Sequence, residues 1–128
     1  MAVELLFKDE CFKLVGLCMK VHTKLGRGFK EIIYKDALEI EFKKDAGLVY
    51  EREKRFAITY DGIILPHKFN ADFLVFNSIV LEIKAIPQIH SDAFRQTLNY
   101  LKASQVKSGI LVNFGTDRLE FQRIVCSY

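Results

Sequence analysis

The chain has 128 residues, of which 50% are hydrophobic and 27% are charged, and its formal net charge is +3. These values are typical of a single globular domain that is large enough to bury its own core. The mild positive charge permits a nucleic-acid partner without requiring one. We therefore expect residues 1–128 to form one domain.

The sequence shows no sign of secretion or of a membrane span. No apolar run approaches the roughly 18 residues needed to cross a bilayer, and the N-terminus lacks a basic stretch followed by an apolar segment. The three cysteines, Cys11, Cys18 and Cys126, include no CxxC pair. They predict reduced, mostly buried thiols in a cytoplasmic protein, and the scattered histidines argue against a zinc site.

The first part of the chain predicts two helices. From residue 7 to about 25, apolar residues recur with the i, i+3, i+4, i+7 spacing of a buried stripe, and Gly26 and Gly28 mark the end of this helix. A second helix is expected from about residue 29 to 44. Its apolar row consists of Tyr34, Leu38 and Phe42.

Three strands should follow as a meander. The first covers residues 48–60 and turns at Asp61-Gly62, a dipeptide typical of tight hairpins. The second runs from about residue 63 to 76, and Pro66 indicates an edge or a bulge near its start. The third covers residues 79–85.

A helix and two strands complete the predicted elements. The helix covers about residues 91–103 with Ser91 as its N-cap, and the strands cover residues 109–114 and 119–125. Because a helix connects the third strand to the next one, these two strands should be parallel. The order predicts an α/β fold, in which a mixed β-sheet is flanked by α-helices on both faces.

Charged residues lie inside two neighbouring predicted strands. Asp72 and the tripeptide Glu82-Ile83-Lys84 each interrupt an apolar run. Burying an unpaired charge is costly, so a strand tolerates one mainly when it has a partner, a metal or a chemical role. Side chains alternate between the faces of a strand. A loop with an odd number of residues, here the three residues 76–78, is therefore needed to set Asp72 opposite Glu82. Lys84 then shares the face of Glu82.

Two carboxylates and a lysine on one patch suit a hard divalent cation and phosphodiester chemistry. The like charges of Asp72 and Glu82 oppose joint ionisation, so one of them should have a raised pKa without a metal. The alternative interpretation is an ordinary surface hairpin in which Lys84 forms an ion pair with one of the two acids.

Three other positions, Glu51, Gln96 and Tyr100, could add groups to this site. If the register continues unbroken across the tight turn, Glu51 lies opposite Asp72 and adds a third carboxylate; alternatively, Glu51 and Glu53 are solvated strand charges. Gln96 and Tyr100 share a helix face and can offer an amide and a hydroxyl group to a phosphate. The alternative for this pair is a surface glutamine and a core tyrosine.

Together these residues resemble the PD-(D/E)XK nuclease superfamily and, more closely, the GxxExxY protein family. The segment Gly28-Phe29-Lys30-Glu31-Ile32-Ile33-Tyr34 matches the motif that names the latter. Further family elements follow in order: Tyr60-Asp61-Gly62, Asp72, Glu82-Ile83-Lys84-Ala85, Gln96 through Tyr100-Leu101, and Gly109 through Asn113-Phe114-Gly115. Ala71 stands where the superfamily signature has a proline.

The resemblance implies a restriction-endonuclease-like core: a helix, a three-stranded meander, a helix and a further strand. It also implies that Asp72 and Glu82 hold Mg²⁺, with Mn²⁺ as a substitute and the Ile83 carbonyl as a third ligand. Lys84 would be the catalytic lysine.

Three further positions match the resembled families. Glu31 corresponds to the acidic residue on the leading helix, which implies that it belongs to the catalytic site with Asp72, Glu82, Lys84 and Gln96, where it supports the carboxylates or contacts substrate. Gln96 and Tyr100 correspond to the Q-x-x-x-Y element of RecB-like nucleases, which implies contacts with substrate or support for the carboxylates.

The leading hypothesis is therefore a Mg²⁺-dependent nuclease that hydrolyses phosphodiester bonds of nucleic acid, with DNA the expected substrate. Two alternatives stay open: a catalytically inactive nuclease-fold module that binds nucleic acid or protein, and an α/β domain of unrelated function. A chain this small has little surface beyond one cleft, which makes a homodimer plausible.

Overall fold

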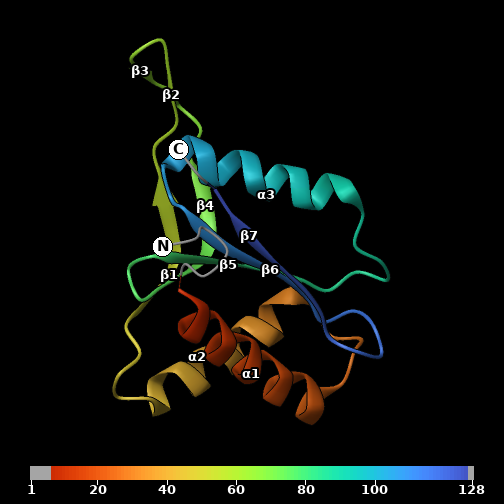
Figure 1. Ribbon diagram of the computed structural model, residues 1–128. Coiled ribbons are helices and arrows are strands. Elements are labelled where there is room, and N and C mark those ends of the chain that lie inside the picture. Colours follow the sequence, from red (N-terminus) through yellow and green to blue (C-terminus); the bar gives the residue numbers. More distant parts are fainter. Residues whose placement is uncertain (1–6, 127–128) are drawn as a thin grey trace.

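The computed structural model describes residues 7–126, and its ribbon is shown in Figure 1. Within these residues the helices are α1 (Lys8–Leu25), α2 (Glu31–Lys44) and α3 (Ser91–Ser104). The strands are β1 (Tyr50–Phe56), β2 (Thr59–Tyr60), β3 (Ile63–Ile64), β4 (Phe69–Val75), β5 (Ile79–Lys84), β6 (Ser108–Asn113) and β7 (Glu120–Val125). None of the helices in this part of the chain is long and apolar enough to cross a bilayer.

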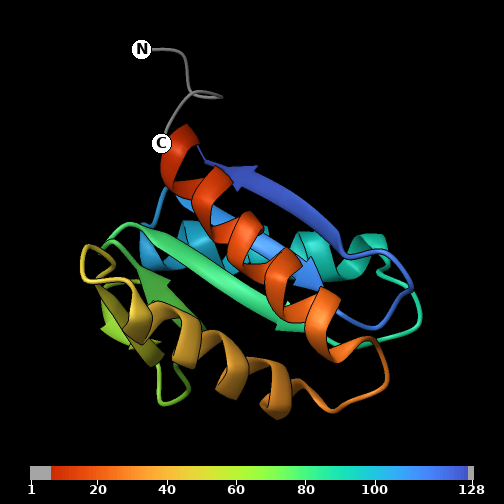
Figure 2. The ribbon, with the colours of Figure 1, turned by 90° about the horizontal axis from the view of Figure 1, so that it is seen from below.

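A five-stranded sheet forms the middle layer of the molecule. Its strand order is β1-β4-β5-β6-β7, and β2 pairs with β3 in a separate hairpin. Helices α1 and α2 cover one face and α3 covers the other (Figures 1 and 2). Strands β5 and β6 are parallel and the other sheet neighbours are antiparallel. The predicted mixed sheet, its flanking helices and its parallel pair are therefore confirmed.

The face under α1 and α2 holds the larger hydrophobic core. The predicted row of α2, Tyr34, Leu38 and Phe42, has no exposed surface. The predicted stripe of α1 is buried at Cys11, Leu14, Cys18 and Val21. Both helices pack on the odd-numbered residues of β5, which are Ile79, Leu81 and Ile83. All three cysteines are buried and unpaired, as expected.

The face under α3 begins with the same kind of packing. Val80 of β5 and Leu111 of β6 contact Leu101 of α3 in a second core cluster. Because strand side chains alternate, Glu82 and Lys84 continue the row of Val80 toward α3. The apolar face of the sheet thus becomes polar at this end of β5. At the start of α3 the N-cap is His90, so the prediction that Ser91 caps the helix was wrong.

Two long predicted strands are each broken in the structure. The strand predicted over residues 48–60 is divided into β1 and β2, and the one over 63–76 into β3 and β4. The tight turn at Asp61-Gly62 does form, since β2 and β3 pair across it. Pro66 lies in the second break, where its missing N–H removes a ladder hydrogen bond. The β2–β3 hairpin consequently leaves the main sheet and projects from it (Figure 1).

Candidate active site

The hairpin between β4 and β5 has the odd loop that the sequence predicted. Val75 pairs with Ile79, which leaves residues 76–78 as a three-residue connection. Two residues of this loop, Phe76 and Asn77, have φ angles of 55° and 57°, so the chain turns in the left-handed region. Continued along the two strands, this register brings Asp72 to Glu82.

Strands β4 and β5 separate at this point, and the two carboxylates occupy the fork. Backbone pairing between the strands extends as far as Phe73 and Leu81. Beyond it, the N–H of Asp72 donates to Oε1 of Glu82 at 3.3 Å, and the N–H of Ile83 donates to Oδ2 of Asp72 at 2.7 Å. Each side-chain oxygen accepts a hydrogen bond that a neighbouring carbonyl would take in a regular ladder. The fork therefore holds the two acids against each other.

A third carboxylate lies across β1 and β4 from Asp72, but it is Glu53 and not Glu51. Glu51 pairs with Leu74, and the residues on either side of Glu53 pair with those on either side of Asp72. Glu53 itself has a φ of 58°, which marks a local distortion of β1. The expectation for Glu51 assumed an unbroken hairpin. The segment that leaves the sheet between β1 and β4 shifts the register by two residues and overturns it.

A buried lysine of α2, which is not among the site residues predicted from the sequence, joins two of these acids. Nζ of Lys35 donates to Oδ1 of Asp72 at 2.9 Å and forms an ion pair with Glu53. Glu53 also accepts a hydrogen bond from the amide of Asn70 at 2.6 Å. Burial opposes the charge of the lysine, but its hydrogen bonds to Glu53 and Asp72 outweigh burial and raise the pKa of Lys35. The ammonium group therefore stays charged and anchors Asp72 from the α2 side.

A signal for Lys35 is present in the helical spacing. It lies three residues before Leu38 and seven before Phe42, so it belongs to the buried face of α2. A lysine in such a stripe requires a carboxylate partner. Buried acids in the facing strands are the natural candidates.

Glu82 is the carboxyl group that cannot easily ionise. Burial, reinforced by repulsion from Asp72, raises the pKa of Glu82 to about 8, and Lys84 opposes this shift only in part. This agrees with the expectation that one of two neighbouring acids has a raised pKa. The fork thus carries more potential negative charge than its own cations balance.

A polar cavity of about 180 Å³ opens between the fork and α3. Its lining comes from three elements or their ends: Glu82 and Lys84 of β5; Gln96, Thr97 and Tyr100 of α3; and Lys68, Phe69 and Asn70 around the start of β4. The ring of Tyr100 stacks on Phe69 with a centroid distance of 4.5 Å, which fixes α3 against β4. The structure thus brings Gln96 and Tyr100 to the same cavity as Glu82 and Lys84, while Asp72 lies beside it in the fork.

The segment from Gly28 to Tyr34 is mainly structural. The hydroxyl of the buried Tyr34 donates to the Gly26 carbonyl at 2.6 Å and accepts from the N–H of Phe29 at 3.2 Å, which closes the loop before α2. Gly28 has a φ of 109°, a conformation that favours glycine. Glu31 is exposed one turn before Lys35, and within residues 7–126 its side chain forms neither a hydrogen bond nor an ion pair. The structure does not bring Glu31 into contact with the fork.

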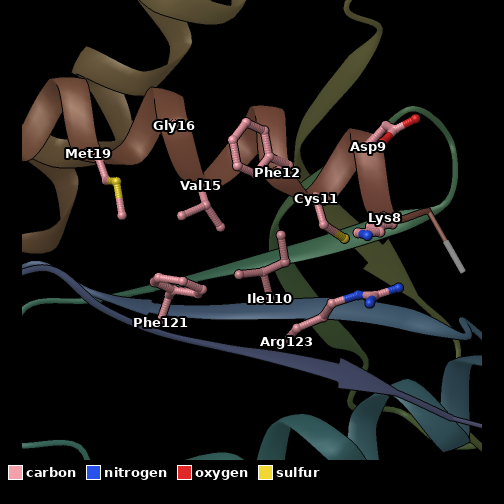
Figure 3. Close-up of a pocket in the computed structure, with 10 residues that line it drawn as sticks. All are labelled: Lys8, Asp9, Cys11, Phe12, Val15, Gly16, Met19, Ile110, Phe121 and Arg123. Atoms are coloured by element: carbon pink, nitrogen blue, oxygen red, sulfur yellow. The ribbon is translucent and has the colours of Figure 1, made fainter. Parts of the chain in front are cut away.

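The opposite face of the sheet carries a larger and different hollow, shown in Figure 3. It measures about 400 Å³ and lies between α1 and the edge strand β7. Most of its lining is apolar: Phe12, Val15, Met19, Ile110 and Phe121. Across residues 7–126, no group of three or more His, Cys, Asp or Glu side chains is arranged to hold a metal. A metal site in this part of the chain would therefore rest on the two carboxylates of the fork.

The chain is similar in sequence to one protein family and in fold to two proteins of known structure. A family model of the PD-(D/E)XK nuclease superfamily matches residues 8–124. The crystal structure of the protein SSO0001 is similar to the chain with a TM-score of 0.54 and 29% identity, over 76% of this chain and 50% of that one. No curated protein matches the sequence.

An alkaline exonuclease from Laribacter hongkongensis matches with a TM-score of 0.44 and 13% identity, over 87% of this chain and 66% of the exonuclease. The chain thus spans half the length of the first of these two proteins and about two thirds of the second. Its mixed sheet with flanking helices is the predicted PD-(D/E)XK nuclease-like core.

Proposed function

We propose, because the chain belongs to the PD-(D/E)XK nuclease superfamily, that its polar cavity hydrolyses phosphodiester bonds of nucleic acid, with DNA as the substrate and Mg²⁺ as the cofactor. The observation that carries this proposal is the fork between β4 and β5. There the N–H of Asp72 donates to Glu82 and the N–H of Ile83 donates to Asp72, and Lys84 lines the adjoining cavity. Membership of the GxxExxY family, which the segment from Gly28 to Tyr34 predicts, is part of the proposal.

The donor groups of the fork fit a hard divalent cation. Asp72 and Glu82 would supply carboxylate oxygens and Ile83 its carbonyl oxygen, and such ligands suit Mg²⁺ or Mn²⁺. The raised pKa of Glu82 supports this fit, because burial and the nearby Asp72 oppose a charge that a cation would balance. When bound, such a cation supplies charge neutralisation at the phosphate and lowers the pKa of a water molecule.

The remaining side chains divide into substrate contacts and supports. Lys84 would donate to a phosphate oxygen or orient the attacking water, which stabilises charge that develops in the transition state. Gln96 and Tyr100 would hold a neighbouring phosphate through an amide and a hydroxyl group. Lys35 is a positioning residue, because it fixes Asp72 from the side away from the cavity. A role for Glu31 stays a prediction from the resemblance, since this residue lies at the start of α2, on the other face of the sheet from the cavity.

Two further features of the protein belong to the proposal. A cytoplasmic location is supported by three cysteines that are buried and unpaired. Dimerisation stays a prediction from chain length, and the molecular mass in solution tests it.

The proposed function is tested by incubating the protein with labelled single-stranded, double-stranded and branched DNA and RNA, in Mg²⁺, Mn²⁺ or EDTA. We expect cleavage of DNA that requires metal and is abolished by Asp72→Ala. Asp9→Ala, a change of an exposed acid at the apolar hollow, serves as the matched control and should cleave normally.

Two outcomes would count against the proposal. A folded wild-type protein that binds nucleic acid but cleaves none of these substrates would be a non-catalytic module. Cleavage that survives in the Asp72→Ala, Lys84→Ala double mutant would come from another site or from a contaminating nuclease.

A further inference from the structure

An exposed apolar hairpin projects from the sheet beside the polar cavity. Strands β2 and β3 extend past the end of α3 (Figure 1), and every residue from 59 to 68 is exposed. Tyr60 and Ile63 are each 68% exposed, and Ile64 is 62% exposed. Burial in the core of this chain does not account for large apolar side chains presented in this way, so they suggest a binding role.

The hairpin is a defined arm rather than a loose loop. Tyr60 pairs directly with Ile63, so their side chains share one face near the tip. Asp61 and Gly62 both have positive φ, 51° and 76°, as the tightest hairpin turns require. At the base, the N–H of Leu65 donates to the carbonyl of Ile58 at 2.8 Å, and Ile58 packs against the core cluster under α3.

Basic side chains connect this arm to the candidate active site. A cavity of about 340 Å³ at the base of the arm is lined by Arg55, Pro66, His67, Lys68 and Asn70. The last two also line the cavity that contains Glu82 and Lys84. No carboxylate lines the cavity at the base of the arm.

The cations along this path are available to a ligand. Within residues 7–126, neither Arg55 nor Lys68 forms an ion pair with a carboxylate, whereas Lys20 and Arg52 are paired with acids. Unpaired cations in two cavities that share lining residues suit the phosphate backbone of a nucleic acid. The path leads from Lys84 to the foot of the arm.

We propose that residues 57–68 form a substrate-binding arm, and that the substrate is a nucleic acid with unpaired bases beside the cleaved bond. This inference rests on the proposed nuclease function and names its substrate class. Phosphates follow Lys84, Lys68 and Arg55, and a base lies against the apolar face of Tyr60 and Ile63. The faces of bases are stacked on one another in a duplex, but in a single strand they are open to an aromatic side chain.

The chain offers a direct probe of this contact, because it contains no tryptophan. Tyr60→Trp places a single indole on the arm and keeps an aromatic ring there. We expect its fluorescence to be quenched by a single-stranded DNA oligonucleotide in EDTA, and far less by a blunt duplex of the same sequence. Phe121→Trp, at the apolar hollow on the other face, is the matched control and should respond to neither DNA.

Binding measurements on variants distinguish the contribution of the apolar tip of the arm from that of the basic residues at its base. The double variant Tyr60→Ser, Ile63→Ser should weaken single-strand binding about tenfold, the order of effect expected when one stacked base is lost. Its affinity for duplex should be nearly unchanged. Arg55→Ala with Lys68→Ala should weaken binding of both DNAs and lower the salt dependence, because two phosphate contacts are removed.

Three results would overturn the inference: equal quenching by single strand and duplex, wild-type affinity of the Tyr60→Ser, Ile63→Ser variant for the single strand, or an emission change that follows protein concentration without DNA. The last would mean that a second copy of the chain covers the arm. Failure of the arm proposal can be distinguished from failure of the proposed nuclease function. A protein without this arm contact can still cleave DNA through Asp72, and a protein that never cleaves can still show the quenching.

Discussion

The two faces of the sheet carry two hollows of opposite character. The hollow under α1 is larger, about 400 Å³, and is lined mainly by apolar side chains (Figure 3). The hollow under α3 is smaller, about 180 Å³, and is polar. A search guided by size and apolar lining alone would select the first. The second holds the groups that can exchange protons and bind cations, so the residues identify the candidate active site better than the volume does.

The difference arises within a single strand. Along β5 the odd-numbered residues are apolar throughout and pack under α1 and α2, whereas the even-numbered row changes from Val80 to Glu82 and Lys84. The charged end of this row is where β4 separates from β5. The fold therefore keeps one face for packing and opens the other for polar chemistry.

Removing Lys84 should strongly reduce activity without removing a proposed metal ligand. We expect Lys84→Ala to slow cleavage by about 10²–10³-fold, the range seen when one transition-state donor is lost. Binding of DNA should weaken far less, because several cations share the phosphate contacts. Lys8→Ala, which removes a cation from the apolar hollow, should leave cleavage unchanged. Single-turnover rates and binding isotherms of the two variants measure this contrast, and equal rates would show that the polar hollow has no special role.

Removing Lys35 should have the largest effect on stability. Lys35→Met leaves Asp72 and Glu53 without their buried partner, and we expect the free energy of unfolding to fall by about 2–3 kcal/mol. The matched control is Lys13→Met, whose ion pair with Asp45 is much more exposed; its loss should cost about 0.5 kcal/mol or less. Urea unfolding measures both changes.

The Lys35 variant also tests the charge balance of the fork. Added Mg²⁺ should raise the melting temperature of Lys35→Met more than that of the wild type, since a bound cation stabilises the folded state and replaces part of the missing charge. A loss of stability no larger than that of Lys13→Met would contradict the role given to Lys35.

The pH dependence of stability should show a gradual effect, spread over the interval between two pKa values of Glu82. The pKa of Glu82 is about 8 in the folded protein and 4.5 in its ordinary state. Between these values the folded chain holds a proton that the unfolded chain has released. The stabilising contribution of this proton is therefore fully present below pH 4.5, and it is lost as the pH rises through about 8. The slope from this group is at most about 1.4 kcal/mol per pH unit.

Unfolding in urea at a series of pH values measures this slope. Glu82→Gln should remove it, and Mg²⁺ should flatten it in the wild type. Asp9→Asn, at the apolar hollow, should leave it unchanged. A wild-type slope that survives in Glu82→Gln would mean that another group carries the proton.

Much of the fold and part of the site could be predicted from the sequence. The buried stripes of α1 and α2 follow from helical spacing, and the parallel pair follows from the helix between β5 and β6. The odd loop at residues 76–78 follows from the requirement that Asp72 and Glu82 meet, because one residue more or less would turn one of them away.

The partners of Asp72 from other elements could not be derived in this way. Glu53, rather than Glu51, faces Asp72 because the arm of residues 57–68 leaves the sheet, and local spacing does not fix how many residues such a break removes from the register. Lys35 is a surface residue by type, and only its place in the stripe of Leu38 and Phe42 indicates burial. Both partners depend on how separate elements come together in three dimensions.

Titration calorimetry with Mg²⁺ tests the central claim that the fork between β4 and β5 holds the metal. Three proteins are compared: the wild type, Asp72→Asn, and Asp9→Asn as the matched loss of a carboxylate at the apolar hollow. We predict a binding heat for the wild type and for Asp9→Asn, and its loss in Asp72→Asn. Equal heats from the wild type and Asp72→Asn would contradict the claim, because they would show that this carboxylate is not a ligand.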